Sequence, residues 1–266
     1  MNKCIARILT AFIPYAPTRK RIRKYLISKE SVLSAFQPLP NDILETLQPP
    51  ENGNRFVLIK TDGTIVENPK IDGLTVNFTG TGCFVAVYGE NTKFGANFSV
   101  SNGASIILDN IHNFNGNVRI NHKNILKIGK NTCVNGADFA MDMEPNANIT
   151  IGNNCLIADR ARFWSSDGHT ILDDEGDVIN LPQEIVIGNH VWLGMDCRIL
   201  KGVKISKNVV VSGPCTLTKS QNKIFEKYPN GCIIVGGYPF RILKENILWD
   251  ARVPTTYAQL KKEGKI

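Results

Sequence analysis

The sequence predicts an all-β protein, built as a solenoid of parallel coils, and a repeat of six residues carries that prediction. Between residues 185 and 217 an aliphatic residue or a cysteine recurs at every sixth position in two frames. One frame contains Ile187, Leu193, Ile199, Ile205, Val211 and Leu217, and the other contains Ile185, Val191, Cys197, Val203, Val209 and Cys215. With 42% hydrophobic residues in the chain, twelve matches out of twelve have a chance of about one in thirty thousand for a given frame. Neither a helical period nor a simple strand alternation explains the pattern.

The period of six also indicates how each coil is built. Six residues suit a short strand with two inward side chains followed by a turn, and three such sides close a triangular coil of about 18 residues. Residues 18 apart, such as Ile187 and Ile205, are then expected to stack at the inter-strand spacing of about 4.8 Å. Residues such as Gly188 and Asn208 fall at the turns, where positive φ angles are needed.

The first 55 residues differ in composition from the repeat. An apolar run at residues 4–13 is followed by five cations within residues 19–24. The run is about half as long as a membrane span and lacks the cleavage site of a signal peptide. Two interpretations of residues 1–27 stay open: a basic amphipathic segment that lies on anionic lipid or docks on a partner enzyme, and a solvated helical cap of the solenoid. The Pro-rich residues that follow, up to 55, read as a connector.

Short strand-like segments begin near residue 56, and we expect the solenoid to extend from there to about residue 222. The expected strands of the first coils are residues 56–59, 74–78, 84–87, 98–100 and 105–108. Residues 223–266 then form a C-terminal segment and tail. Two excursions interrupt the sixfold frame, at residues 141–148 and 164–183. Loops of this kind cost little closure entropy and often carry function, so the chemistry is expected there.

Charge and cysteine content restrict the partners. The net charge of +7 is compatible with anionic lipid or an acidic substrate, but many of the cations cluster near the N-terminus, and no nucleic-acid partner is expected. The seven cysteines include no CxxC pair. They are interpreted as small core residues in a reducing compartment, without a disulfide framework or a metal site.

Three motifs resemble the active-site signature of the bacterial hexapeptide-repeat acyltransferases. They are Ser-Asp-Gly-His-x-Ile at residues 166–171, Ile-Gly-Asn-His-Val-Trp-Leu-Gly at 187–194 and Ile-Leu-Lys-Gly-Val at 199–203. The likeness covers roughly residues 56–243 and is strongest to O-acetyltransferases of polysialic acid and other capsular or lipopolysaccharide sugars. It implies a left-handed parallel β-helix with an N-terminal helical segment and a C-terminal tail.

The resemblance also implies roles for three side chains. His169 matches the general base, which is needed because a sugar hydroxyl is a poor nucleophile at neutral pH. Trp192 matches the tryptophan beside the acetyl group, and Asp167 or Asp173 is a candidate to orient the imidazole. The structural alternatives are a loop histidine that makes one hydrogen bond and an aromatic side chain at the edge of a coil.

Acetyl-coenzyme A is the donor that the resemblance implies, and no metal is expected. Small residues that would let the pantetheine approach the backbone are Gly194, Gly202, Ser212 and Gly213, and candidates for the nucleotide end are Lys219, Gly237, Pro239 and Arg241. The usual Gly-Ala-Gly-Ser of the family appears as Ser-Gly-Pro-Cys at residues 212–215. Its proline removes a backbone donor.

The resemblance further implies a homotrimer with active sites between neighbouring chains, and a polysaccharide or sugar acceptor. A cytoplasmic location is expected, with residues 1–27 as a candidate contact with the inner-membrane surface or with capsule-assembly enzymes. The main alternative is an N-acetyltransferase that acts on an amino sugar or a xenobiotic. A carbonic anhydrase of this fold would need three histidines that converge on zinc, and of the four histidines only His169 lies in the loop motif. A non-catalytic scaffold gives no reason for the motifs to occur together.

Overall fold

The computed structural model describes residues 53–266. These residues lie within one unit of the chain, Pro49–Ile266. The expectations for residues 1–27 and for most of the connector therefore lie outside the described residues. Within residues 53–266 no helix combines the length and the apolar character that a membrane span requires.

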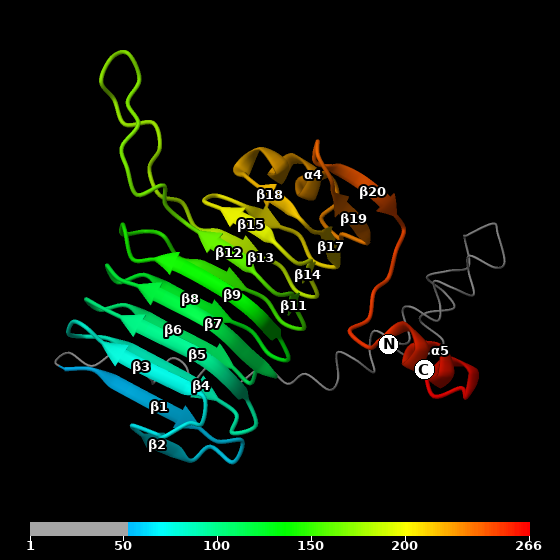
Figure 1. Ribbon diagram of the computed structural model, residues 1–266, viewed down its shortest axis with the longest axis horizontal. Coiled ribbons are helices and arrows are strands. Elements are labelled where there is room, and N and C mark those ends of the chain that lie inside the picture. The colour runs from blue at the N-terminus through cyan, green and yellow to red at the C-terminus, as the bar shows by residue number, and fades with distance from the viewer. Residues whose placement is uncertain (1–52) are drawn as a thin grey trace, which may run out of the picture. The chain divides into compact units, whose positions relative to one another are not determined.

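Parallel strands from successive coils stack into a β-solenoid with three faces, which are numbered here in chain order (Figure 1). Face 1 carries β1 (Arg55–Ile59), β4 (Phe84–Tyr88), β6 (Ser105–Asp109), β8 (Ile125–Ile128), β10 (Ile149–Ile151), β13 (Ile185–Ile187) and β16 (Lys204–Ile205), with the short antiparallel β2 (Ile65–Glu67) at its end. Face 2 carries β11 (Leu156–Ile157), β14 (Trp192–Leu193), β17 (Val209–Ser212) and β19 (Ile233–Gly236). Face 3 carries β3 (Leu74–Phe78), β12 (Ala161–Trp164), β15 (Cys197–Leu200) and β18 (Cys215–Leu217).

Three long strands join faces 2 and 3 in the earlier coils: β5 (Lys93–Val100), β7 (Asn113–Ile120) and β9 (Cys133–Met141). The first residues of β9 pair with β11 on face 2, and residues 137–140 pair with β12 on face 3. β7 bends in the same way where it passes from face 2 to face 3. Glycine is required there at Gly116, which has φ +132°, because a Cβ would lie 1.9 Å from the carbonyl oxygen of Ala137. The segments expected for the first coils are confirmed by β1, β3, β4, β5 and β6, and β5 is longer than predicted.

The predicted 18-residue register is confirmed in the last coils. Ile187 stacks under Ile205, and Leu193 stacks under Val211. All twelve positions of the sixfold frame are buried except Cys215, which is half-buried. The side chains of Cys197 and Cys215 stack with their sulfur atoms 3.7 Å apart and remain free thiols. These cysteines lie in the core, as the sequence predicted.

The earlier coils are longer, and this explains why the sixfold frame is irregular there. Their interior contains a series of phenylalanine rings from successive coils, of which the first pair meets edge to face and the last pair is stacked. The ring centroids lie 5.2, 5.8 and 4.6 Å apart along the series Phe98, Phe114, Phe139 and Phe163, all of which are buried. Large rings need wider coils than aliphatic pairs do, so the spacing of inward residues departs from six.

The stack extends beyond residue 222, where the sequence suggested that it ends. The 3₁₀ turn η1 (Lys219–Gln221) and helix α4 (Asn222–Lys227) interrupt the coil, and β19 then pairs in parallel with β17. β20 (Arg241–Glu245) folds back antiparallel to β19 and closes the stack. Helix α5 (Pro254–Lys262) follows near the C-terminus. The sixfold frame missed β19 because the inserted helix changes the spacing of the residues that stack.

One buried carboxylate in the solenoid provides a test of stability. Asp109 at the end of β6 is only 9% exposed, and its Oδ1 has no hydrogen-bond partner within the described part of the chain. Burial raises the pKa of this carboxyl to about 6, against the lowering influence of Lys130 and Lys127. A raised pKa means that the folded state binds the proton more tightly than the unfolded state, so this favourable contribution is lost as the pH rises through 6.

We therefore expect Asp109→Asn to increase the free energy of unfolding by about 1 to 3 kcal/mol at pH 8 and to change it little at pH 4. Urea unfolding followed by circular dichroism at the two pH values measures the difference. An equal gain at both pH values would contradict the account, because it would not depend on ionisation.

Candidate functional site

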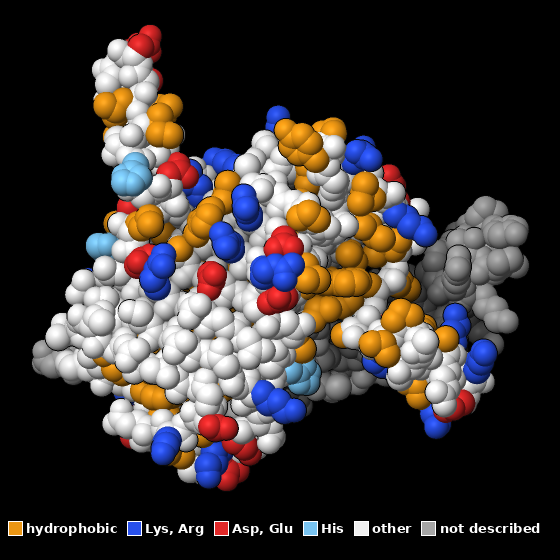
Figure 2. All heavy atoms as spheres, in the orientation of Figure 1, with side chains coloured by type: hydrophobic (Ala, Val, Ile, Leu, Met, Phe, Trp, Pro, Cys, Tyr) orange, Lys and Arg blue, Asp and Glu red, His pale blue; other side chains and the backbone are white. Residues whose placement is uncertain are grey.

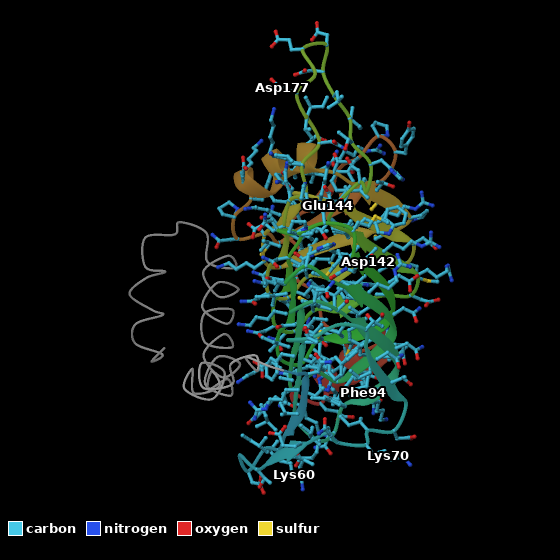
Figure 3. The ribbon with its side chains drawn as sticks, turned by 90° about the vertical axis from the view of Figure 1, so that its left-hand side faces the viewer. Lys60, Lys70, Phe94, Asp142, Glu144 and Asp177 are labelled. Carbon is cyan, nitrogen blue, oxygen red and sulfur yellow. The ribbon has the colours of Figure 1, made fainter. Side chains whose placement is uncertain are left out.

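The longer excursion forms an arm, defined as residues 165–184, that leaves face 3 after β12 and returns at β13 (Figure 1). The arm is closed at its base by a hydrogen bond from the Gln183 amide to the Ser165 carbonyl, at 3.2 Å. Further out, Leu172 and Val178 form an antiparallel bridge. The Asp173 carboxylate accepts the backbone amides of Glu175 and Asp177 and so shapes the turn at the far end, where Figure 3 labels Asp177.

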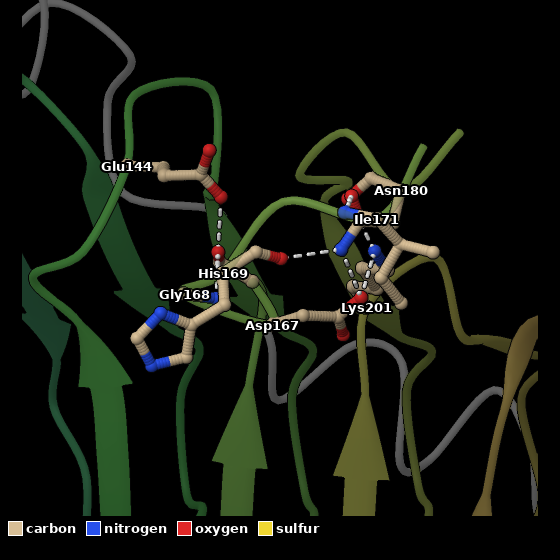
Figure 4. A network of polar contacts seen from close by, with 8 residues as sticks. Glu144, Asp167, Gly168, His169, Ile171, Asn180 and Lys201 are labelled. Atoms are coloured by element: carbon tan, nitrogen blue, oxygen red, sulfur yellow. Dashed lines mark hydrogen bonds and ion pairs between the residues drawn. The ribbon is translucent and has the colours of Figure 1, made fainter. Parts of the chain in front are cut away.

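A polar network fixes the backbone around His169 (Figure 4). The Asn180 side chain donates to the His169 carbonyl at 2.7 Å and to Asp167 Oδ2 at 3.0 Å, and it accepts from the Ile171 amide at 2.8 Å. Lys201, from the coil above, donates to Asp167 Oδ2 and to the Asn180 carbonyl, both at 2.5 Å. Asp167 and the His169 backbone are thus linked through one shared amide donor.

The two excursions predicted from the sequence meet at this network. Glu144, from residues 142–148, accepts a short hydrogen bond from the Ser166 hydroxyl, and the same hydroxyl oxygen accepts the Gly168 amide at 3.0 Å. Glu144 is held in turn by the buried Asn124, whose amide donates to the Glu144 carbonyl at 2.7 Å. Gly168 has φ +73°, which accounts for glycine before the histidine.

The imidazole of His169 is exposed, and no hydrogen bond joins it to another residue within 53–266. Figure 4 shows the ring pointing away from Asp167. Burial alone would raise the pKa of the Asp167 carboxyl, but the hydrogen bonds from Lys201 and Asn180 outweigh it and leave the pKa below its usual value. Asp167 is therefore an ionised anchor of the arm, and its proposed contact with the ring stays a prediction.

Trp192 lies on a different face from His169. It points outward from β14 on face 2, 37% exposed, between Leu156 of the coil below and Val210 of the coil above. His169 follows a strand of face 3. Among the described residues no contact joins these two side chains, so one chain alone does not bring the two main candidates together.

A third aromatic residue, which the sequence did not single out, lies beside Trp192. The Trp249 ring centroid is 6.0 Å from that of Trp192 and 4.1 Å from that of His190, with which it stacks at an interplanar angle of 7°. Trp249 occurs in a C-terminal segment outside the sixfold repeat, so no period indicated it. His190 is half-buried, and its ring packs against Trp249.

The residues predicted to bind the cofactor fall into three groups. Gly194, Ser212 and Gly213 lie at the corner between faces 2 and 3. A Cβ on Gly194 would lie 2.6 Å from the amide nitrogen of Gly213, and one on Gly213 would lie 1.8 Å from the carbonyl oxygen of Met195. Coil stacking therefore already requires glycine at both positions, and their role in cofactor binding stays a prediction.

The second group lies at a cavity of about 750 Å³ between the outer surface of face 3 and the β19–β20 turn, called here the arginine pocket. Gly237 and Pro239 line it, and Arg241 lies next to Gly237. Arg160, Arg162 and Arg198 line it as well. Arg160 forms a two-bonded ion pair with Asp196, with N–O distances of 2.8 and 2.7 Å. Neither Arg162 nor Arg198 forms an ion pair with another residue of the described part.

The third group lies elsewhere, at the base of the arm. Gly202 and Lys219 line a cavity of about 460 Å³, called here the amide pocket because Asn146, Asn148, Gln183 and Asn222 contribute side-chain amides to it. Its Lys204 pairs with Glu184 at 2.8 Å, whereas the exposed Lys219 has no ion pair within the described residues. Lys219 is thus separated from the other candidates for the nucleotide end.

No family model matches the chain. The polysialic acid O-acetyltransferase of Escherichia coli O1:K1 / APEC is 32% identical over 123 residues, which cover 46% of this chain and 37% of that protein. The galactoside O-acetyltransferase of Escherichia coli strain K12 is 32% identical over 123 residues, covering 45% of this chain and 54% of that protein. The chain therefore spans about a third to a half of the length of these relatives.

Among solved structures, the crystal structure of the polySia-specific acetyltransferase NeuO is similar to this one. The TM-score is 0.53 at 21% sequence identity, and the likeness covers 71% of this chain and 99% of that chain. At this identity the likeness supports the fold, and it agrees with a left-handed parallel β-helix.

The network predicts that Asp167→Asn loosens the base of the arm, because the charge that holds Lys201 is removed. Hydrogen–deuterium exchange of backbone amides 166–172 is expected to become at least about threefold faster at neutral pH. In the wild type the same loosening is expected as the pH falls: the pKa of Asp167 is lowered in the folded state, so its stabilisation is present above the unfolded pKa of about 4 and lost below it.

The matched control is Asp177→Asn, which removes an exposed carboxylate from the far end of the same arm. We expect no change in exchange at residues 166–172. Equal effects of the two substitutions would contradict a specific role of Asp167.

Proposed function

We propose that the chain is a hexapeptide-repeat acyltransferase, and more closely an O-acetyltransferase that moves an acetyl group from acetyl-coenzyme A to a hydroxyl of a bacterial surface polysaccharide or its precursor. The observation that carries the proposal is the arm base. There the Ser-Asp-Gly-His motif is held by the network from Glu144, Asn180 and Lys201, while the His169 ring remains exposed. The names of the relatives support acetyl transfer to a sugar hydroxyl.

His169 acts as the general base in this proposal. An imidazole nitrogen takes the proton of the acceptor hydroxyl while its oxygen attacks the thioester carbonyl. The tetrahedral intermediate then collapses, the carbon–sulfur bond breaks, and the leaving thiolate receives the proton from the imidazolium. The products are an O-acetyl ester and free coenzyme A. A fixed backbone and a free ring suit this role, since the ring must meet a substrate without losing its place.

The separation of His169 and Trp192 on one chain supports a site shared between two chains. Figure 2 shows apolar side chains on the surface of the arm. The exposed large ones are Ile171, Leu172, Val178, Ile179 and Leu181. The outward column of face 2 is also apolar in five successive coils, at Cys133, Leu156, Trp192, Val210 and Ile234. The corresponding column of face 3 is polar, with Asn117, Asp138, Arg162 and Arg198.

We infer that the arm of one copy packs on face 2 of the next and that three copies close a ring. The exposed apolar side chains of the arm and the exposed Trp192 on face 2 favour this head-to-tail contact, because each would cover the other. In such a trimer His169 of one copy approaches Trp192 of its neighbour.

The donor has a continuous path in this arrangement. The arginine pocket suits the phosphates of coenzyme A, because Arg162 and Arg198 have no ion pair within residues 53–266 and guanidinium groups bind phosphate well. The corner at Gly194 and Gly213 separates that pocket from Trp192 on face 2. A pantetheine chain that crosses this corner would carry the thioester from the arginine pocket to Trp192.

The amide pocket is the proposed acceptor subsite. The amides of Asn148 and Asn222 already bond to the backbone, and their remaining capacity together with the amides of Asn146 and Gln183 can serve sugar hydroxyls. Lys219 favours an acceptor with a carboxylate, such as a sialic acid. The polysialic acid relative supports the anionic acceptor, and the galactoside relative supports a neutral one.

The proposal predicts that the protein releases free coenzyme A thiol from acetyl-coenzyme A only when a suitable oligosaccharide is present. His169→Ala is expected to lower kcat at least about a hundredfold, since general base catalysis contributes that much or more. His112→Ala, another exposed histidine, serves as the control and should keep the wild-type rate. An unchanged rate in His169→Ala would exclude His169 as the base, and turnover only with amines would indicate an N-acetyltransferase.

The shared site predicts a second result. The double substitution Ile179→Ser and Leu181→Ser on the arm is expected to shift the sedimenting species from trimer towards monomer and to reduce activity in parallel. Ile125→Ser, an exposed apolar position on face 1, is the control and should leave the trimer intact. A double variant that stays trimeric would contradict the role of the arm in assembly.

A further inference from the structure

The strap, defined as residues 246–253 between β20 and α5, attaches the C-terminal part of the chain to face 2. Its backbone is anchored by a hydrogen bond from the Ile247 amide to the Cys232 carbonyl, at 3.0 Å. Its side chain Trp249 donates from Nε1 to the His190 carbonyl, also at 3.0 Å. The second of these hydrogen bonds attaches the strap at His190, which lies two residues before Trp192 in the sequence.

The ring under Trp249 is itself held rigidly. His190 Nδ1 lies 3.1 Å from Asn208 Oδ1, and the Asn208 amide nitrogen donates to the Asn230 carbonyl at 3.1 Å. Because the amide nitrogen of Asn208 is used there, its oxygen faces His190, and Nδ1 carries the hydrogen. Burial is the main influence on His190 and lowers the pKa of its imidazole, against the opposing effects of Asn208 and Asp250. The ring is neutral at pH 7 and offers Trp249 a fixed flat surface.

Among the described residues, no hydrogen bond within its own coil holds the Trp192 ring in the way that Asn208 holds His190. It stands on the outer surface of a sheet, and its register neighbours Leu156 and Val210 are small compared with an indole. Trp249 is the one aromatic ring of the described residues that meets it, with an interplanar angle of 45°. A side chain that stands on a flat sheet has several accessible rotamers unless a neighbour excludes some of them.

We propose that Trp249 is a positioning residue that holds the indole of Trp192 in one orientation, so that the C-terminal strap is a working part of the acetyl-transfer site. The proposal rests on the proposed function in giving Trp192 a place beside the acetyl group. Asn230, Asn208, His190 and Trp249 form a chain of contacts that ends on Trp192. A wall that is already ordered lowers the cost of aligning the thioester with the acceptor.

The first part of the test needs no activity. The chain contains three tryptophans, Trp164, Trp192 and Trp249, so protein labelled with 5-fluorotryptophan gives three ¹⁹F resonances that single Trp→Phe variants assign. In Trp249→Leu the Trp192 resonance is expected to shift towards the position of exposed indole and to change in width. Trp164→Phe is the matched control, because Trp164 is equally exposed, at 37%, and lies on face 3. It should leave the Trp192 resonance unchanged, and an unchanged Trp192 resonance in Trp249→Leu would overturn the proposal.

The second part measures thiol release from acetyl-coenzyme A. Trp249→Leu is expected to lower kcat about tenfold while the trimer and its circular dichroism are kept, and Trp249→Phe, which retains a ring but loses the hydrogen bond to His190, is expected to fall between. Wild-type kcat and KM in a correctly assembled Trp249→Leu protein would also overturn the proposal. If the wild type itself transfers no acetyl group, the proposed function fails, and the ¹⁹F spectra still decide whether Trp249 orients Trp192.

Discussion

The structure depends on one constraint, the parallel backbone pairing that locks each coil in register with the next. Every side of a coil is bonded to the sides above and below it at about 4.8 Å, so one residue position defines a column along the solenoid. Inward columns become the core and outward columns become surfaces of uniform character. The apolar column through Trp192 and the polar column through Arg198 are therefore properties of faces 2 and 3, and each column continues over several coils.

The same constraint explains why the chain can carry a long arm at little cost. Ile149 pairs with Ile185 across an insertion, just as Ile187 pairs with Ile205 without one. Strand pairing requires only that the chain returns in register, so the length of the inserted loop has little effect on it. What orders the arm base is a separate polar network through Asn180 and neighbouring charges, and this leaves the His169 ring exposed.

Sequence reasoning was most successful where function and fold share one repeat. The sixfold frame predicted the inward residues and the 18-residue register, and the motif predicted that the arm would carry His169. It could not predict that Asn180 and Lys201 meet Asp167, because these contacts join segments far apart in sequence. It linked Gly194 and Gly213 with the cofactor, whereas coil stacking alone already requires glycine there. The contact between Trp249 and Trp192 could not be predicted, because the strap follows no repeat and its position depends on tertiary packing.

The central claim is that each site takes His169 from one chain and Trp192 from its neighbour, and mixed trimers test it most directly. His169→Ala and Trp192→Ala subunits would each be inactive alone and would be co-expressed in equal amounts. Random assembly then gives an intact His169–Trp192 pair at about a quarter of the interfaces. We predict recovery of roughly a quarter of the wild-type thiol release. If the mixture stays as inactive as its parents although mixed trimers form, the two residues act within one chain, and the account of a shared site is wrong.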